Sequence, residues 1–477
     1  MRVITICLAY STGITTYLSG IVTIATPAIA SDLRLSPGLT LWPVTIYSLT
    51  CGCTLLLCGS ISDVVGSRQT YLFGCIMLCV STVACGLSKT GVQMLVFRGI
   101  SGVAASFILP SAVSLIRDVY PPGKARNIAF ATMGGAQPVG FGIGLVLGGF
   151  ITGAIGWSWG FHIAAISNFA MLIAAAWALP PGLPGHSSTW RRLAFEMDWL
   201  GVFLASTSLA LLSYVIAIVT GDSSIIRQAQ NIAFLVLSFV FMAAFVFWMS
   251  HQEARGRPAI VPNSLWRNKM FSCICINVFL IWSAFNAFEQ YQNFFFQDLQ
   301  GLSTLDAALR FIPAPVSGAL TNVVVGLVVH RARGDWIIVL TTIPCAVASL
   351  LMAIAQPQWS YWACAFLANF LNPIGADGIF TVSNLLITSM FPTKTQGVAG
   401  GVFNTVSQTG KSVGLALAAL VAEQTKRNMQ SAGSDDRSAL LDGYHAAFWF
   451  CMATVLASLM VTIWGLRDIG KVGQKED

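Results

Sequence analysis

Residues 41–68 read LWPVTIYSLTCGCTLLLCGSISDVVGSR, an apolar run at 41–60 followed by a short polar segment. A run of roughly 20 apolar residues is long enough for a helix to cross the ~30 Å hydrocarbon core of a bilayer. In the polar segment, Gly59 and Asp63 end the helix, Gly66 allows a tight turn, and Arg68 follows as a cation. The stretch therefore predicts a membrane-crossing helix and a short loop. In the simplest alternative, Asp63 and Arg68 are only solvated charges in a hairpin.

The whole chain of 477 residues shares this apolar character. Hydrophobic residues make up 55% of it and charged residues only 9%, against roughly a quarter charged in soluble domains. A soluble protein of this length could not hide so much apolar surface. Fourteen apolar segments predict an all-α membrane protein with 14 transmembrane helices, at about 4–28, 41–60, 70–88, 93–115, 127–153, 161–180, 199–220, 231–250, 270–297, 304–329, 336–355, 360–390, 396–421 and 445–466.

The distribution of basic residues supports this count. With the N-terminus inside, the outer loops hold six of them (Arg34, Lys89, Arg227, Lys426, Arg427 and Arg437), three lie inside helices, and the other seventeen lie on the inner side. An excess of Lys and Arg on the cytoplasmic side is the usual orientation signal of membrane proteins. We therefore expect both termini in the cytoplasm, and the plasma membrane as the location. The net charge of +7 is divided among loops, so we expect no nucleic-acid partner.

The segments divide into a six-helix half (1–180), a linker with two extra helices (181–267) and a second six-helix half (268–477). The two halves resemble parallel repeats, since each has a short loop after its second helix. We expect no metal and no cofactor, because most of the twelve cysteines lie in apolar runs and the five histidines are scattered. A membrane-embedded enzyme would need such groups clustered at one depth, so no enzyme is expected.

Five ionisable residues lie at membrane depth, where charge is expensive and marks functional sites: Arg98, Glu289, Arg310, Asp377 and Lys411. Glu289 and Arg310 lie at similar depths in neighbouring helices, and so do Asp377 and Lys411. Each acid therefore has a candidate base. Structural ion pairing is the alternative to a functional role for both pairs.

Polar and aromatic residues accompany Glu289 along its helix. Trp282, Phe285, Glu289 and Gln292 share one helical face by their spacing. Aromatic rings beside a carboxylate can bind a cationic or amphipathic organic solute. A packed aromatic stripe is the alternative explanation of this spacing.

Asp377 follows the sequence Asn372-Pro373-Ile-Gly375-Ala and precedes Gly378. A proline and two glycines beside an acid in the membrane predict a bent or interrupted helix, which transporters use at binding sites. Asn372 is a candidate substrate-binding residue in this stretch.

Three glycines recur at four-residue intervals in the fifth segment, at Gly140, Gly144 and Gly148, with Gly142 and Gly149 beside them. This places a stripe without side chains on one helix face, which permits very close helix packing. A functional role for the stripe would be that of a gate that slides or bends.

The chain resembles the major facilitator superfamily, and specifically its fourteen-helix drug:proton antiporter branch. The loop with Gly59, Asp63, Gly66 and Arg68 is similar to the family's signature loop, Arg98–Gly102 to its arginine motif, and Gly140–Gly149 to its antiporter motif. Met197–Gly201 resembles the signature of the fourteen-helix members. The sequence departs from the family with Val64, Ser67 and Leu145, and with Leu18 where an acidic residue is common.

The resemblance implies that the first and fourth helices of each half line a central cavity, which would place Arg98, Glu289 and Asp377 there. We predict a monomeric exporter in which proton entry drives a small organic molecule out of the cytoplasm by alternating access. Asp377 is the first candidate for proton coupling and Glu289 the second, with Lys411 as partner. Arg98 would bind an anionic substrate group or polar backbone. The gating residues would be the loop residues Gly59, Asp63, Gly66 and Arg68 and the stripe glycines Gly140, Gly144 and Gly148. The alternative is a facilitator or proton-coupled importer on the same fold.

Overall fold

The computed structural model describes residues 2–121, 123–180, 198–219, 228–257, 260–329, 331–391 and 393–467. All its regular elements are helical. The first six are α1 (Arg2–Asp32), α2 (Trp42–Val65), α3 (Ser67–Gly86), α4 (Gly91–Val119), α5 (Lys124–Ile155) and α6 (Trp157–Ala178), with a short 3-10 turn η1 (Pro37–Leu39) before α2. The first part of the predicted linker, 181–197, lies outside the described residues.

The second part of the chain begins with α8 (Trp199–Val219), α9 (Ala229–Ala254) and the short α10 (Ser264–Arg267). The last group comprises α11 (Lys269–Phe294), η3 (Phe295–Leu299), α12 (Thr304–Arg310), α13 (Pro313–Val328), α14 (Gly334–Ala353), η4 (Tyr361–Ala363), α15 (Ala365–Met390), α16 (Thr393–Ser431) and α17 (Asp436–Gly465). The all-α prediction is confirmed.

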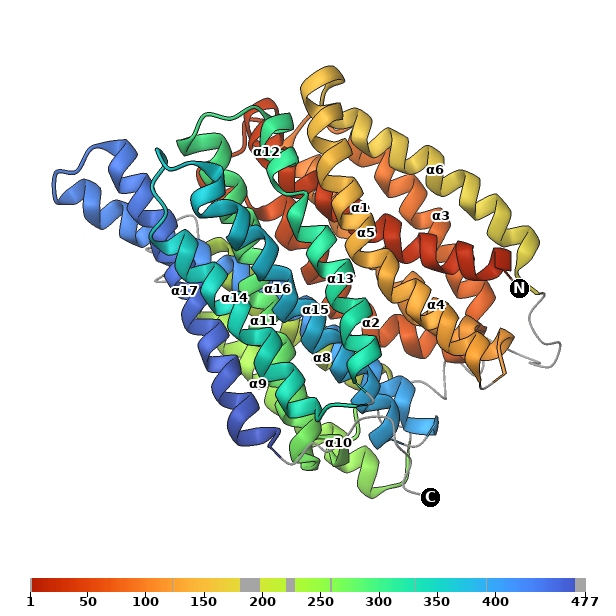
Figure 1. Cartoon of the computed structure of the whole chain (residues 1–477). Helices are drawn as coiled ribbons and strands as arrows, with labels where there is room; N and C mark the ends of the chain where they lie inside the picture. Colours follow the sequence, from red (N-terminus) through yellow and green to blue (C-terminus); the bar gives the residue numbers. More distant parts are fainter. Residues whose placement is uncertain are drawn as a thin grey trace.

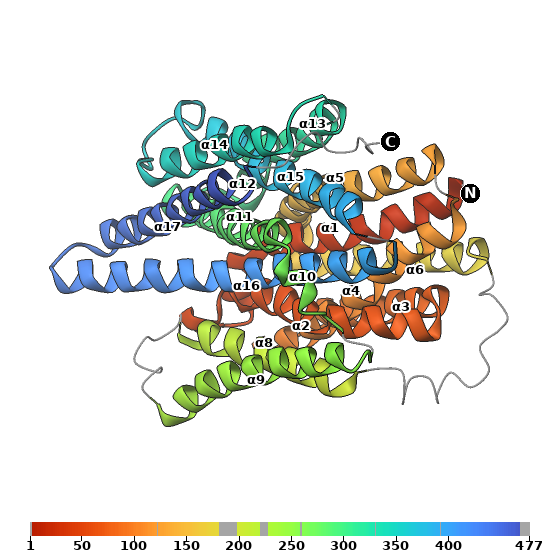
Figure 2. The same ribbon diagram turned by 90° about the horizontal axis from the view of Figure 1, so that it is seen from below.

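The helices form one bundle in which the two halves lie side by side (Figure 1). In the first half α1 packs along α5, and α4 packs between α2 and α3. In the second half α11 packs against α16 and α17, and α14 against α15 and α17. We call the end where α1 begins and α17 ends the termini end, which lies to the right in Figure 2, and the opposite end the far end. The pair α8–α9 packs against α2 and α16.

Within the described residues, twelve helical segments are long and apolar enough to cross a membrane: α1 to α6, α9, α11 with η3, α12 with α13, α14, α15 and α17. At the two other predicted segments lie α8, whose apolar stretch Trp199–Leu212 is shorter, and α16, which is 39 residues long and has a polar end. The chain is thus a multi-pass integral membrane protein. The number fourteen stays a prediction.

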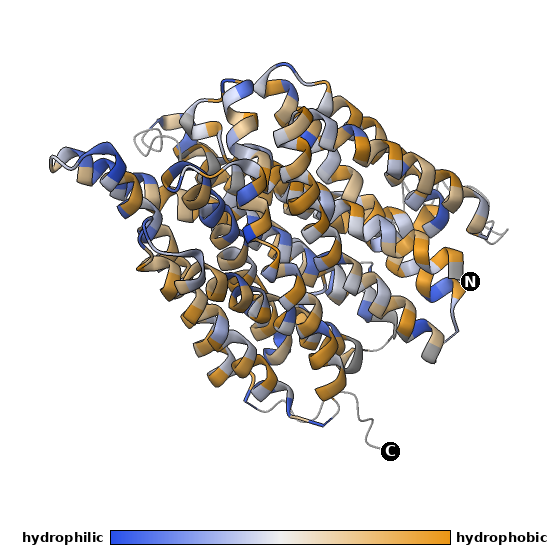
Figure 3. Ribbon diagram, turned by 45° about the horizontal axis from the view of Figure 1, so that its top comes forward, coloured by the Kyte–Doolittle hydropathy of each residue, from blue (hydrophilic) through white to orange (hydrophobic). Residues whose placement is uncertain are grey.

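The surface of the bundle is apolar along its length and polar at its ends (Figure 3). Large side chains such as Trp177, Trp464 and Phe247 are 89%, 80% and 75% exposed. A water-soluble monomer rarely carries apolar patches of this extent, whereas hydrocarbon chains of a bilayer cover them at no cost.

Of the bent or interrupted helix predicted near Asp377, the interruption is wrong, because α15 runs without a break from Ala365 to Met390 with Pro373 inside it, while the bend stays a prediction. The break lies in the neighbouring helix instead, between the end of α12 at Arg310 and the start of α13 at Pro313. Proline lacks the N–H group that would continue the hydrogen-bond ladder. The next N–H, that of Ala314, bonds to the Phe311 carbonyl at 3.0 Å instead of to Arg310. The Arg310 carbonyl, thus left out of the ladder, accepts hydrogen bonds from the Tyr361 hydroxyl (2.8 Å) and the Asn369 amide (2.9 Å).

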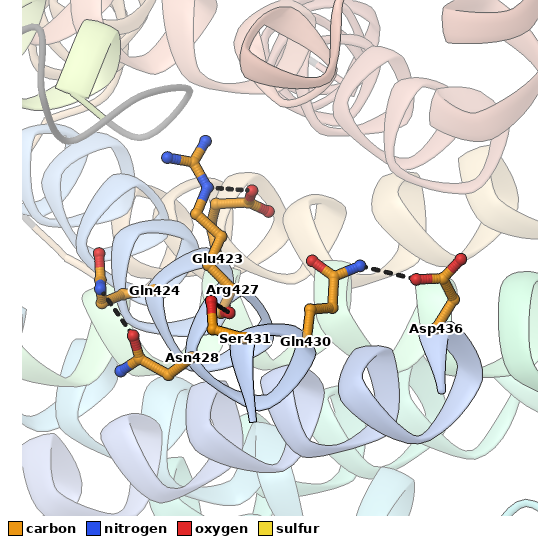
Figure 4. Close-up of polar contacts among 7 residues, drawn as sticks. All are labelled: Glu423, Gln424, Arg427, Asn428, Gln430, Ser431 and Asp436. Carbon is orange, nitrogen blue, oxygen red and sulfur yellow. Dashed lines mark hydrogen bonds and ion pairs between the residues drawn. The ribbon is translucent and has the colours of Figure 1, made fainter. Parts of the chain in front are cut away.

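At the far end, α16 and α17 project past the other helices as a hairpin, at the upper left of Figure 1. The prediction ended the first of these helices too early, at 421, and began the second too late, at 445, because the projecting turns are polar. They are stabilised by their own contacts (Figure 4): Glu423 pairs with Arg427 at 2.8 Å, and Gln430 donates to Asp436 at 2.8 Å across the turn.

Candidate functional site

Three of the five predicted intramembrane charges come together in the second half. Glu289 lies on α11, Asp377 on α15 and Lys411 on α16, and the three are near enough for their charges to interact. The charge of Lys411 attracts both carboxylates, while the two carboxylates repel each other. We call these three residues the charged cluster. All three side chains are described, and no ion pair within 4.0 Å joins Lys411 to either acid.

Asp377 is held by α13. The amide of Asn322 donates to Asp377 Oδ1 at 3.1 Å and also to the Gly318 carbonyl at 3.1 Å. The other oxygen, Oδ2, lies so close to Gly318 that a side chain at this position would collide with it. Gly318 and Asn322 escaped the sequence analysis, although an amide four residues after a glycine in an apolar helix is a signal that could have been followed.

Glu289 is 4% exposed, and its Oε1 finds no hydrogen-bond partner among the described residues. The same holds for both polar atoms of Gln290, for Gln292 Oε1 and for the Trp282 indole nitrogen, all on α11. A buried polar atom without a partner costs about 1–3 kcal/mol. These atoms on one helix, beside a carboxylate, are available to hydrogen-bond a polar ligand.

Lys411 rests on an aromatic ring instead of on an acid. Its Nζ lies 4.1 Å from the centroid of the Trp282 ring. Trp282 in turn contacts Phe285 at 5.3 Å and Phe380 of α15 at 6.0 Å between ring centroids. The predicted aromatic face of α11 therefore contacts α15 and α16. The indole ring of Trp282 already binds one cation, the ammonium group of Lys411.

Asn372 faces away from this cluster. Its side-chain oxygen accepts a contact from the Cys345 thiol of α14 at 3.4 Å. Gly375 and Gly378, on the same side of α15, leave room for Cys345 and Thr341 of α14. These glycines serve close packing of α15 on α14, while Asp377 lies on the side toward α13.

Arg98 lies apart from the cluster, in the first half. It is 1% exposed, donates from Nε to the Pro43 carbonyl at 3.0 Å, and lies 4.6 Å above the Tyr47 ring. One of its terminal nitrogens, Nη1, finds no partner among the described residues. The sequence predicts that Arg98 binds an anionic substrate group or polar backbone. The structure contains the second of these, the Pro43 carbonyl.

Arg310 and Glu289 are not brought together. Arg310 Nη1 donates to Gln300 Oε1 at 2.6 Å, and the guanidinium lies 5.5 Å from the centroids of both the Phe296 and Tyr361 rings. The pairing predicted from depth is wrong, because the break after α12 directs this side chain toward the far end.

The glycine stripe of α5 contacts two neighbours. Gly140, Gly144 and Gly148 face the backbone of α1, where added side chains would meet Gly13, Tyr17 and Ile21. Gly142 and Gly149 face Pro315 and Ala308 of the second half. The predicted close packing is confirmed, and it includes a contact between the two halves.

The loop after α2 connects three helices at the termini end. Gly66 has φ 110°, a left-handed conformation that glycine adopts without strain. Arg68 donates to the Ala176 carbonyl of α6 at 2.9 Å. Gly59 faces Pro110 of α4 at an ordinary van der Waals distance.

Asp63 lies within reach of the charges of Arg117 and Asp118 on α4. Arg117 approaches Gly397 of α16 from the other half. Of the predicted gating residues, Asp63 is therefore linked through one arginine to the contact between the halves at the termini end.

Direct hydrogen bonds join the two halves toward the far end. Asn293 donates to the Thr23 carbonyl at 2.7 Å, and Gln297 to the Ile24 carbonyl at 2.9 Å. The first pair connects α11 to α1 and the second connects η3 to α1, so the two halves are held together beyond the level of Glu289.

Comparison with known proteins places this geometry in a family. Residues 8–415 match the profile of the Major Facilitator Superfamily. The chain is 37% identical to MFS-type transporter 1 of Pyricularia oryzae over 96% of its length and 82% of the relative. It is 25% identical to the efflux pump terJ of Aspergillus terreus over 89% and 79%.

A solved structure shares the fold. The bacterial homologue of the human lysosomal transporter Spinster, in an inward-facing and unoccupied conformation, superposes with a TM-score of 0.64 at 13% identity, over 98% of both chains. With a family match across most of its helices and a curated relative over nearly its whole length, this chain belongs to the Major Facilitator Superfamily.

Proposed function

We propose that the protein is a secondary-active exporter that moves a small organic molecule out of the cytoplasm in exchange for protons. The observation that carries the proposal is the charged cluster, in which two carboxylates lie near enough to one ammonium group for their charges to interact. With all three ionised, the cluster has a net charge of −1. In a medium of low dielectric constant such a charge is unstable, and binding one proton removes it.

The coupling step that we propose uses the mobility of Lys411. A lysine ammonium is a point charge on a flexible stem, so it can exchange one partner for another. While Lys411 lies on the Trp282 ring, Asp377 has Asn322 as its one hydrogen-bond partner among the described residues and binds a proton. When a rearrangement brings Lys411 to Asp377, the ion pair stabilises the carboxylate and the proton leaves.

The substrate site in this proposal is the face of α11 beside the cluster. Trp282 and Phe285 supply aromatic surface, and Gln292 supplies an unpartnered oxygen next to Glu289. A cationic or amphipathic solute would compete with Lys411 for the Trp282 ring. Solute binding would thereby move Lys411 toward Asp377 and release the proton, which links the two fluxes.

A facilitator or proton-coupled importer on the same fold is the second candidate. It is favoured by the first half, where the buried cation Arg98 is bound to backbone and Leu18 stands where the family commonly has an acid. In that case the cluster would serve uptake, and only the direction of net flux would differ.

The proposal includes a topology and a place. We propose fourteen membrane-crossing helices, including α8 and α16, with both termini in the cytoplasm, in the drug:proton antiporter branch of the family. The protein would act as a monomer in the plasma membrane.

Growth tests the direction of transport. A transporter-deficient host expressing the protein is exposed to a panel of toxic organic compounds, and the cellular content of each active compound is measured. Export predicts resistance together with lower accumulation than in the empty host. Greater sensitivity and higher accumulation would overturn the exporter and favour the importer.

A further inference from the structure

A second candidate site lies at the far end, away from the charged cluster. The segment between η3 and α12 and the segment between α14 and α15 enclose a pocket of about 420 Å³. This volume lies within the range of about 300–1,000 Å³ that is common for small-ligand sites. Its lining combines the side chain of Arg310 with three aromatic residues, Trp359, Tyr361 and Trp362.

Arg310 has unused hydrogen-bond donors in this pocket. One N–H of its guanidinium donates to Gln300, and its central carbon lies 5.5 Å from the centroids of both the Phe296 and Tyr361 rings. Its remaining N–H groups meet no acceptor in the part of the chain that the structure describes. A guanidinium presents its N–H groups as a planar fork, and this fork suits the oxygens of a phosphate.

No carboxylate in the described loops neutralises Arg310. Asp306, one helical turn earlier, bonds to Ser303 at 2.6 Å in the N-terminal cap of α12. Burial raises the pKa of Tyr361 to about 12, so its hydroxyl stays neutral and donates to the Arg310 carbonyl. The pocket therefore has a net positive charge.

The two indole rings differ from Tyr361 in being open. Trp359 is 46% exposed and Trp362 is 71% exposed. Trp362 packs on Phe366 at 5.0 Å and on Tyr361 at 5.3 Å between ring centroids, and most of its surface still stays exposed. Exposed indole faces attract quaternary ammonium groups by cation–π interaction.

The position of the pocket points to its occupant. Gln300 and Leu302 follow the end of the membrane-crossing segment Lys269–Leu299, and Pro357 to Trp362 lie between Gly334–Ala353 and Ala365–Ile387, while Arg310 lies in the first two turns of the segment Thr304–Val328. The pocket therefore lies where the lipid headgroups meet the hydrocarbon core. We propose that this pocket binds the phosphocholine headgroup of a membrane lipid, with the phosphate on Arg310 and the trimethylammonium group on Trp359 and Trp362.

Native mass spectrometry of the detergent-purified protein tests the assignment. The full chain is titrated with dioleoyl phosphatidylcholine or with dioleoyl phosphatidylglycerol, which has the phosphate but no ammonium group. Arg310→Gln should weaken retention of both lipids by about tenfold, the effect of losing a charge-assisted hydrogen bond. Trp362→Leu should weaken retention of phosphatidylcholine alone, by about threefold.

The matched control is Arg34→Gln, an exposed arginine at the same end that does not line the pocket. Equal lipid retention by Arg310→Gln and Arg34→Gln would overturn the proposal. So would an unchanged preference between the two lipids in Trp362→Leu, or displacement of the lipid by an equal concentration of soluble phosphocholine. Because the pocket shares no residue with the charged cluster, these outcomes leave the proposed transport function untouched.

Discussion

Asp377 depends on a neighbour that has no side chain. Gly318 of α13 lies against Asp377 Oδ2, and Asn322, one turn later, donates to Oδ1. A larger residue at 318 would displace the carboxylate from Asn322. The geometry of the acid is thus determined by a helix on which the prediction placed no functional residue.

Gly318→Ala should therefore reduce gradient-driven transport strongly and cost about 1–3 kcal/mol of stability by overpacking. Gly326→Ala is the matched control, because nothing lies within 4 Å of a side chain added there. In an exposed helix interior that control should be neutral or stabilising by up to about 1 kcal/mol. Transport rate and thermal stability of the purified variants are measured together; identical behaviour of the two would refute the role of Gly318.

Lys411 is the residue that we expect to set when the proton leaves. Lys411→Ala removes the contact with Trp282, worth about 0.5–2 kcal/mol, and leaves two acids without a base. Proton-coupled flux should fall while binding of solute persists or strengthens, since the Trp282 ring is then free. Lys426→Ala, in the projecting hairpin, is the control. Wild-type coupling in Lys411→Ala at equal abundance would contradict this role.

At the residue scale, sequence reasoning found the right members of the cluster but not all their contacts. Depth along each helix follows from the rise per residue, so Asp377 could be matched with Lys411, while Glu289 was matched with Arg310. The direction of a side chain depends on the rotation of its helix about the helix axis and on breaks in the helix. Neither can be derived from the depth of a residue along the helix. Arg310 was misassigned for this reason, and Lys411 was expected on Asp377 rather than on Trp282.

At the scale of elements, α5 is the helix that couples the halves. One glycine stripe holds it against α1, and two further glycines admit Pro315 and Ala308 from the second half. Close packing of this kind allows backbones to slide past each other without side chains interlocking. We expect this helix to move during the transport cycle.

Gly144→Leu should abolish transport, because the added side chain would force the backbone of Tyr17 away from α5. Gly153→Leu, at the end of the same helix, is the control, since the space around Gly153 is open. Both proteins should be detectable in the membrane. Transport near the wild-type rate in Gly144→Leu would show that the stripe is not a close-packed moving contact.

The elements themselves could be predicted because membrane-crossing helices have a strong compositional signal, and the glycine spacing in α5 gave its packing face. The site of the helix interruption could not be predicted from the sequence. Pro373 lies in a helix that stays continuous, with Gly375 and Gly378 fitted to α14. The break fell at Pro313, where two side chains from α15 and its preceding turn are available to bond the freed carbonyl. Such compensation comes from tertiary contacts and is invisible in local sequence.

At the scale of the whole molecule, the account requires an even number of crossings with the chain ends on one side. A reporter inserted at Gly433, between α16 and α17, should read extracytoplasmic, and one inserted in the 181–197 segment should read cytoplasmic. The excess of basic residues on the predicted inner side motivates this. Detection of both reporters on the same side would refute the fourteen-helix topology.

The two halves differ in chemistry although they share a fold. The second half holds the charged cluster, and the first half offers glycine stripes and an arginine bound to backbone. We therefore expect coupling to reside in the second half and the moving contact in the first. Composition predicted the helical membrane architecture. The different roles of the two halves could be inferred only from the side-chain contacts in the structure.

The measurement that tests the central claim most directly is transport by Asp377→Asn in everted membrane vesicles, with and without an imposed pH gradient. The solute is one to which the wild-type protein confers resistance, and protein abundance is matched. We predict that the gradient drives uphill transport by the wild type but not by Asp377→Asn, while exchange without a gradient persists in the variant. Uphill transport by Asp377→Asn at the wild-type rate would contradict the account, and Glu289 would then be the residue to examine.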